Sequence, residues 1–154
     1  MRYSLWLLVA CSLGAVSMAK ADDTIYMLGK LNIQGTTYTQ LVFFSDKDIT
    51  SVEACEKEVM YGRTGQWQHY GHLVNKAAGL NISMNYICRA SAETLSTWQP
   101  RERYGLIYEV DIRDNGLKLA EHNTYADCIS HFKQQKIEES YEHFCAKSNQ
   151  RIVK

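Results

Sequence analysis

The sequence predicts an α+β protein made of two ββαβ-like modules, each with an antiparallel sheet, one helix packed on that sheet and one disulfide. Three observations predict this fold class. Apolar residues alternate with polar ones over several short runs, which is the pattern of half-buried strands. Two other stretches carry apolar residues at helical spacing after a capping residue. Four cysteines fall at corresponding places in the two halves, behind a leader-like N-terminus.

Residues 1–21 have the order of a secretory signal peptide. Arg2 supplies the positive start, an apolar stretch follows, and small residues flank a predicted cleavage after Ala21. Two alternatives stay open: lipidation at Cys11, and a retained membrane anchor at the short limit for spanning. Cleavage predicts an exported mature chain, in the periplasm, outside the cell or at the cell surface, with no membrane span.

The first module is predicted over residues 22–90 and begins with two strands. The first strand carries alternating apolar residues, namely Ile25, Met27, Leu31 and Ile33. The second strand covers residues 37–44 after a turn at Gly35, and Thr50 then opens a capping box at the start of a helix. The apolar face of this helix is formed by Val52, Cys55 and Val59. A strand over residues 82–88 closes the module.

The second module is predicted over residues 104–154 and repeats this order of elements. Its first strand again alternates, with Leu106, Tyr108, Val110 and Ile112. Asp114-Asn115-Gly116 predicts a hairpin turn because its later residues tolerate positive φ, and residues 117–122 return as the partner strand. A helix capped by Thr124 follows, and residues 141–145 close the module. The apolar face of that helix is formed by Tyr125, Cys128 and Phe132.

The disulfide pairing follows from these placements. In each module one cysteine lies on the apolar face of the helix, and another lies on the closing strand, which packs against the helix. Four cysteines allow three pairings, and this arrangement favours Cys55 with Cys88 and Cys128 with Cys145. A module of about 50 residues buries too little apolar surface to be secure alone, so each disulfide has a stabilising role.

Composition excludes several classes of protein. The chain has 17 basic and 17 acidic residues, so it lacks the positive charge of a nucleic-acid binder. It is 45% hydrophobic and contains one proline, which is typical of a globular protein rather than a collagen-like or disordered one. It has no Gly-rich phosphate loop and no Gly-x-Ser-x-Gly motif, so the sequence predicts no cofactor and no catalytic serine.

Three kinds of reactive site receive little support. A metal site needs three or four converging donors, but only His69 and His72 are closely spaced, so the histidines are interpreted as surface side chains and no metal is predicted. Those in the second module are His122, His131 and His143. Cys128 beside His131 has the spacing of a thiol and its base, but the predicted disulfide consumes the thiol. Acidic residues are interleaved with lysines around both helices, which is typical of a solvated face. They are Asp46, Asp48, Glu53, Glu56, Glu58, Glu138, Glu139 and Glu142.

Two segments break the repeated pattern and carry the predicted binding surface. Residues 91–103 join the modules, and residues 62–80 form an insertion in the first module. The predicted partner-binding residues in these segments are Trp67, His69, Tyr70, His72 and Trp98. Aromatic side chains supply rigid contact area with a polar end, which favours contact with a protein partner.

A non-enzymatic binding function is therefore predicted, with no catalytic residues. The exported protein is expected to be an accessory or structural component of a cell-envelope or extracellular assembly. One alternative is an inhibitor that inserts residues 62–74 into a secreted or envelope-directed enzyme. Another is a small hydrolase with a carboxylate dyad that sequence spacing does not reveal.

Overall fold

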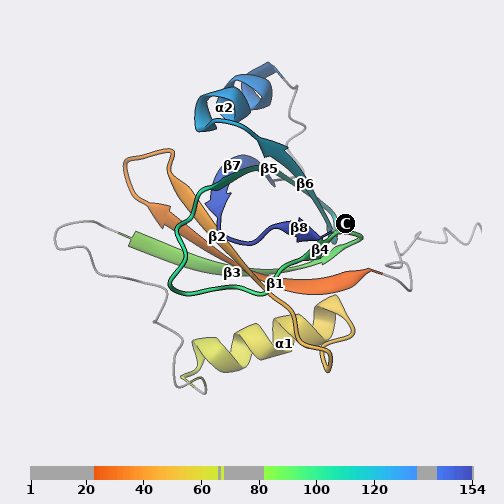
Figure 1. Ribbon diagram of the computed structural model, residues 1–154. Coiled ribbons are helices and arrows are strands. Elements are labelled where there is room, and N and C mark those ends of the chain that lie inside the picture. The colour runs from red at the N-terminus through yellow and green to blue at the C-terminus, as the bar shows by residue number, and fades with distance from the viewer. Residues whose placement is uncertain (1–22, 66, 68–81, 135–141, 154) are drawn as a thin grey trace, which may run out of the picture.

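The computed structural model describes residues 23–65, 67, 82–134 and 142–153. Within these residues, six strands form one closed barrel in the order β1-β2-β7-β5-β6-β3 (Figure 1). The barrel strands are β1 (Thr24–Ile33), β2 (Thr39–Phe44), β3 (Ile82–Ser91), β5 (Leu106–Arg113), β6 (Gly116–His122) and β7 (Glu142–Ser148). A small sheet pairs β4 (Thr94–Leu95) with β8 (Ile152–Val153). The helices are α1 (Val52–Arg63) and α2 (Tyr125–Gln134), so the fold is mixed α+β.

The barrel consists of two antiparallel sets of strands. In one set β1 lies between β2 and β3, and in the other β5 lies between β6 and β7. The sets join through parallel contacts, Gln40 with Lys147 and Ala90 with Gly116. The sequence predicts the order of these elements but not their closure into one barrel, because no local pattern encodes the pairing between the two sets.

The hairpin between β5 and β6 is confirmed, but its strained residue differs from the prediction. Arg113 pairs with Gly116, which leaves a two-residue turn. The positive φ falls on Asp114, at 50°, rather than on the later turn residues. A short polar side chain such as that of Asp tolerates this left-handed conformation.

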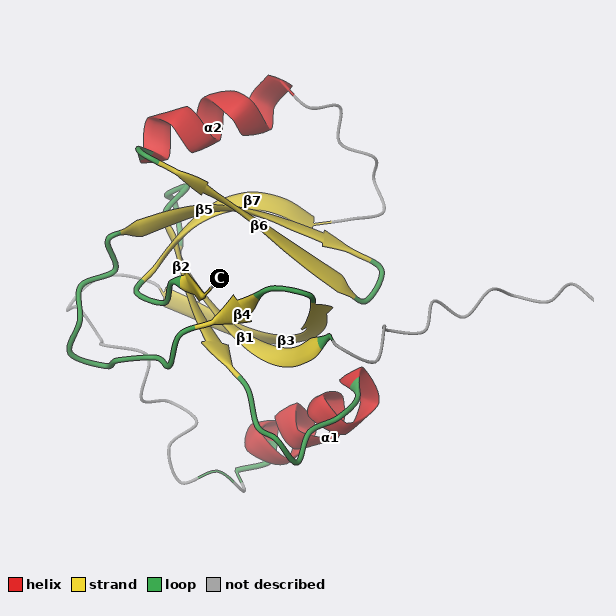
Figure 2. Cartoon of the chain, turned by 45° about the vertical axis from the view of Figure 1, so that its right-hand side comes forward, coloured by secondary structure: helices red, strands yellow, loops and turns green. Residues whose placement is uncertain are grey.

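The helices lie outside the barrel, on opposite sides of it (Figure 2). α1 packs on β1 and β3, and α2 packs on β5, β6 and β7. The cap of α1 is Ser51, whose hydroxyl oxygen accepts from the Ala54 N–H at 3.1 Å, so the predicted cap at Thr50 is wrong by one residue. The predicted cap of α2 is confirmed, since the Thr124 hydroxyl accepts from the Asp127 N–H at 3.1 Å.

The strands are buried on two faces. Tyr26 and Leu28 of β1 point into the barrel, whereas Ile25 and Met27 pack in the layer beneath α1. Of these four residues, only Ile25 and Met27 are predicted from the sequence as buried, because one buried face is expected for each sheet. Inside the barrel, buried Gln150 hydrogen-bonds through its side chain to both the N–H and the carbonyl of Phe43, at 2.7 and 2.8 Å.

A disulfide ties each helix to the barrel. Cys55 of α1 is bonded to Cys88 of β3, and Cys128 of α2 is bonded to Cys145 of β7, which is the pairing that the sequence favours. In the part of the chain that the structure describes, neither helix is long and apolar enough to cross a membrane. The predicted leader and most of the predicted insertion lie outside the described residues.

Candidate functional site

A buried carboxylate lies on the outer surface of the barrel, beneath α2. Glu109 is in the middle of β5, between Tyr108 and Val110, which point into the barrel interior. Because side chains alternate along a strand, Glu109 faces outward, toward the helix. Only 5% of its surface is exposed to solvent, which is rare for a glutamate without partners.

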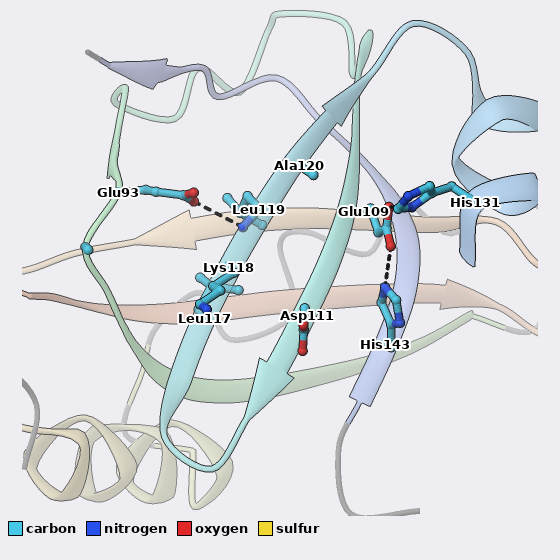
Figure 3. Close-up of a pocket in the computed structure, with 10 residues that line it drawn as sticks. Glu93, Glu109, Asp111, Leu117, Lys118, Leu119, Ala120, His131 and His143 are labelled. Atoms are coloured by element: carbon cyan, nitrogen blue, oxygen red, sulfur yellow. Dashed lines mark hydrogen bonds and ion pairs between the residues drawn. The ribbon is translucent and has the colours of Figure 1, made fainter. Parts of the chain in front are cut away.

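Three histidines converge on this carboxylate. His122 at the end of β6 places its Nε2 at 2.8 Å from Oε2 of Glu109, and His131 of α2 places its Nδ1 at 2.6 Å from the same oxygen. His143 of β7 places its Nε2 at 2.6 Å from Oε1. Figure 3 shows Glu109 between the His131 and His143 side chains. Both carboxylate oxygens are therefore occupied by imidazole nitrogens.

The Cys128–Cys145 disulfide holds two of these histidines in place. His131 follows Cys128 by one helical turn, so both side chains lie on the face of α2 that meets the barrel. His143 precedes Cys145 by two positions, so both lie on the same face of β7. The rings of Phe132 and His143 also pack edge to face, with centroids 5.1 Å apart. The cluster is thus built on rigid elements that are linked covalently.

The histidines determine the ionisation of Glu109. Burial by itself raises the pKa of the Glu109 carboxyl, because the charged form loses hydration. Hydrogen bonds from His122, His131 and His143, together with the charge of His131, lower the pKa by a larger amount. The net result is a pKa below the usual value, so Glu109 is an ionised carboxylate at neutral pH.

An open pocket of about 460 Å³ adjoins the cluster. Its polar lining residues are Glu93, Glu109, Asp111, Lys118, His131 and His143. Glu93 accepts a hydrogen bond from the Leu119 N–H at 3.1 Å, and burial raises the pKa of its carboxyl. In the view of Figure 3, Glu93 lies to the left of β6 and Glu109 to its right, and both side chains line this pocket.

The corresponding surface beneath α1 is apolar. Met27 of β1 is paired with Cys88, just as Glu109 of β5 is paired with Cys145. Two residues before Cys88, Tyr86 occupies the place that His143 has before Cys145, and it packs with Met27 in an apolar cluster. The same arrangement of strands, helix and disulfide therefore forms without a charged group at this position.

The predicted aromatic surface is divided between separate internal contacts. Trp67 packs edge to face on Tyr86, with ring centroids 5.6 Å apart, and its Nε1 donates to a Glu58 carboxylate oxygen at 2.6 Å. Trp98 packs against Phe44 and donates to the Tyr104 hydroxyl at 3.0 Å. The other predicted partner-binding residues lie outside the described part of the chain, namely His69, Tyr70 and His72.

The cluster is not predicted from the sequence, because its histidines are widely spaced along the chain and are interpreted as isolated surface side chains. His143 is instead buried, with 8% of its surface exposed, and His122 is partly buried. Two signals were available. Glu109 is a charged residue inside a run of apolar residues, and His143 takes the place of Tyr86 relative to the closing cysteine. Neither signal identifies the three-dimensional grouping by itself.

Three of these residues could hold a metal ion. Ligand atoms of Glu109, His122 and His131 all lie within 4.8 Å of one another. Imidazole nitrogens and carboxylate oxygens are common ligands of zinc and other transition metals.

No protein-family model matches this chain, and neither curated proteins nor solved structures give a match.

Proposed function

We propose that the protein is an exported, non-enzymatic binding protein whose ligand site is the cluster of Glu109, His122, His131 and His143. The observation that carries this proposal is the buried Glu109 carboxylate with imidazole nitrogens on both oxygens. In this proposal the protein serves as an accessory or structural binding component of a cell-envelope or extracellular assembly.

A binding role is favoured over a purely structural one by the contrast between the two barrel halves. Burying a carboxylate costs hydration energy, and apolar residues of similar volume often give equal or greater stability. The layer beneath α1 uses Met27 and Tyr86 at the corresponding places. Polar groups that the fold does not require are expected at functional sites, where stability is traded for activity.

Binding is also favoured over hydrolysis. The pKa of Glu93 is raised and that of Glu109 is lowered, a separation that acid–base pairs use. The Glu93 carboxylate is however engaged by the backbone of β6, since it accepts a hydrogen bond from the Leu119 N–H at 3.1 Å. Glu109 is also engaged by three histidines, which leaves it poorly available as a nucleophile.

Two further parts of the proposal come from the sequence. The leader over residues 1–21 and the two disulfides support export, because disulfides persist in oxidising compartments. The matching strand order in β1–β3 and β5–β7 supports an internal repeat, with modules over residues 22–90 and 104–154.

A stability comparison tests whether the cluster is dispensable for folding. The double variant Glu109→Met, His143→Tyr copies the residues of the other half, and we expect its urea midpoint to equal or exceed that of the wild type. The matched control, Met27→Glu, places an unpaired carboxylate beneath α1 and is expected to cost about 3 kcal/mol. A large loss of stability in the double variant would assign the cluster to the fold instead.

A ligand screen tests binding directly. Nuclear magnetic resonance signals of the imidazole rings are recorded for the mature wild-type chain with divalent metal salts, with small carboxylic acids and with primary amines. We expect at least one class to shift the signals of His122, His131 and His143 while the signals of His69 and His72 stay in place. If no class shifts the cluster signals, the proposed ligand site is wrong.

A further inference from the structure

We propose that Glu109, His122 and His131 bind one divalent transition-metal ion of the zinc class, and that His143 orients the carboxylate. This inference rests on the proposed function and specifies its ligand. The three donors come from β5, β6 and α2, so the site exists only in the folded chain. Their ligand atoms already lie within 4.8 Å of one another.

The chemistry of the donors selects the class of metal. Two imidazole nitrogens and one carboxylate oxygen suit Zn²⁺ and related transition-metal ions. Ca²⁺ and Mg²⁺ instead prefer sets made only of oxygen ligands. The described cysteines are held in disulfides, so the set contains no thiolate. Three protein donors leave at least one coordination position for water or for a ligand group.

Small side-chain movements bring the donors to ligand geometry. Around a tetrahedral ion with bonds of about 2.1 Å, neighbouring ligand atoms lie about 3.4 Å apart. Oε2 of Glu109 now lies 2.8 Å from Nε2 of His122 and 2.6 Å from Nδ1 of His131. Each nitrogen must therefore retreat by less than about 1 Å. The His131 side chain is 55% exposed, so it has space to rotate.

A metal ion that binds here takes the place of the protons that lie between Glu109 and the two histidines His122 and His131. In the hydrogen-bonded cluster, a proton lies between Oε2 and each of the two nitrogens. A nitrogen that binds metal carries no proton, so the proton passes to solvent or to the other nitrogen of the same ring. The carboxylate contributes its negative charge to the cation.

His143 completes the arrangement as a positioning residue. Its Nε2 lies 2.6 Å from Oε1, the carboxylate oxygen that faces away from the other two histidines. A hydrogen bond to Oε1 fixes the carboxylate plane and directs Oε2 to the metal. Such outer partners change metal affinity by about 10- to 100-fold when they are removed.

Isothermal titration calorimetry of the metal-stripped mature chain with zinc sulfate tests this assignment. We expect one ion per chain. Glu109→Gln and His131→Ala are each expected to weaken binding by at least about 100-fold, and His143→Gln by about 10-fold. The matched control is the double variant His69→Ala, His72→Ala, which removes the closely spaced pair and is expected to bind like the wild type. Urea denaturation of every variant verifies that it is folded.

The outcomes separate this inference from the proposed function. Absence of zinc binding, or loss of binding only in the His69, His72 double variant, would overturn the metal site. If zinc fails but carboxylic acids or amines shift the cluster signals, the ligand class is wrong and the proposed site survives. If the Glu109→Met, His143→Tyr variant loses its stability and the wild-type chain binds none of the tested ligands, the cluster belongs to the fold and both proposals fail.

Discussion

Removing the two disulfides one at a time separates their roles in stability and in the site. The sequence separation is 33 residues for Cys55–Cys88 and 17 residues for Cys128–Cys145. From the loop entropy of the unfolded chain, losing the first should cost about 4 kcal/mol and losing the second about 3 kcal/mol. The double cysteine-to-alanine variant of the longer loop is therefore expected to be the less stable one.

Loss of the Cys128–Cys145 disulfide should reduce zinc affinity more than loss of the Cys55–Cys88 disulfide, although it should cost less stability. The Cys128–Cys145 disulfide lies one helical turn from His131 and two residues from His143, so its loss loosens two groups of the cluster. The Cys55–Cys88 disulfide holds α1, which carries none of these groups. We expect zinc affinity to fall by about 10-fold or more in the Cys128→Ala, Cys145→Ala variant and to stay unchanged in the other.

The assay is urea unfolding followed by tryptophan fluorescence, with zinc titration of the same samples at a urea concentration where both variants are folded. The variant without Cys55–Cys88 serves as the matched control for a general loss of stability. Equal losses of zinc affinity in the two variants would refute the argument that the Cys128–Cys145 disulfide positions the cluster. A smaller stability loss for the longer loop would refute the entropy estimate.

Three further variants test individual contacts. Glu93→Gln keeps the acceptor for the Leu119 N–H. Because the pKa of Glu93 is raised in the folded chain, its carboxyl favours folding below the usual pKa and loses that contribution as pH rises. Urea midpoints should therefore show the variant more stable than wild type at neutral pH and equal to it at pH 3. Gly62→Ala places a Cβ into the Trp67 ring and should cost about 1–3 kcal/mol in urea unfolding; a neutral result would contradict this packing. Gln150→Leu leaves the buried N–H and carbonyl of Phe43 without their partner and should cost about 3 kcal/mol, whereas a loss below 1 kcal/mol would show that water replaces the side chain.

The elements and the disulfides could be predicted because their signals are local. Strand alternation and helical spacing depend on neighbours within a few residues, and each cysteine lies on a recognisable face of its element. The cap at Ser51 instead of Thr50 shows the limit of this approach, since both residues can accept from the first helical turn.

Barrel closure could not be predicted because its signals are non-local. The contacts between the strand sets, Gln40 with Lys147 and Ala90 with Gly116, join residues that have no distinctive sequence pattern. Gln150, which bridges to Phe43 inside the barrel, lies 107 positions away from that residue. A polar residue near the end of the chain gives no sign that it fills an interior.

The cluster around Glu109 could not be predicted either, because its residues are far apart in the sequence. His122, His131 and His143 lie 13, 22 and 34 positions from Glu109, on three different elements. Motif spacing detects ligands only when neighbouring donors share one turn or one loop. Trp67 lies outside the repeated pattern, so the sequence does not indicate that its ring packs on Tyr86.

Anomalous diffraction from crystals of the mature chain grown with zinc locates a bound ion at the cluster. Data collected on both sides of the zinc absorption edge identify the metal and its position. We expect one peak bonded at about 2.1 Å to Oε2 of Glu109, Nε2 of His122 and Nδ1 of His131. A peak bound only elsewhere, with Glu109 still hydrogen-bonded to its three histidines, would contradict this expectation.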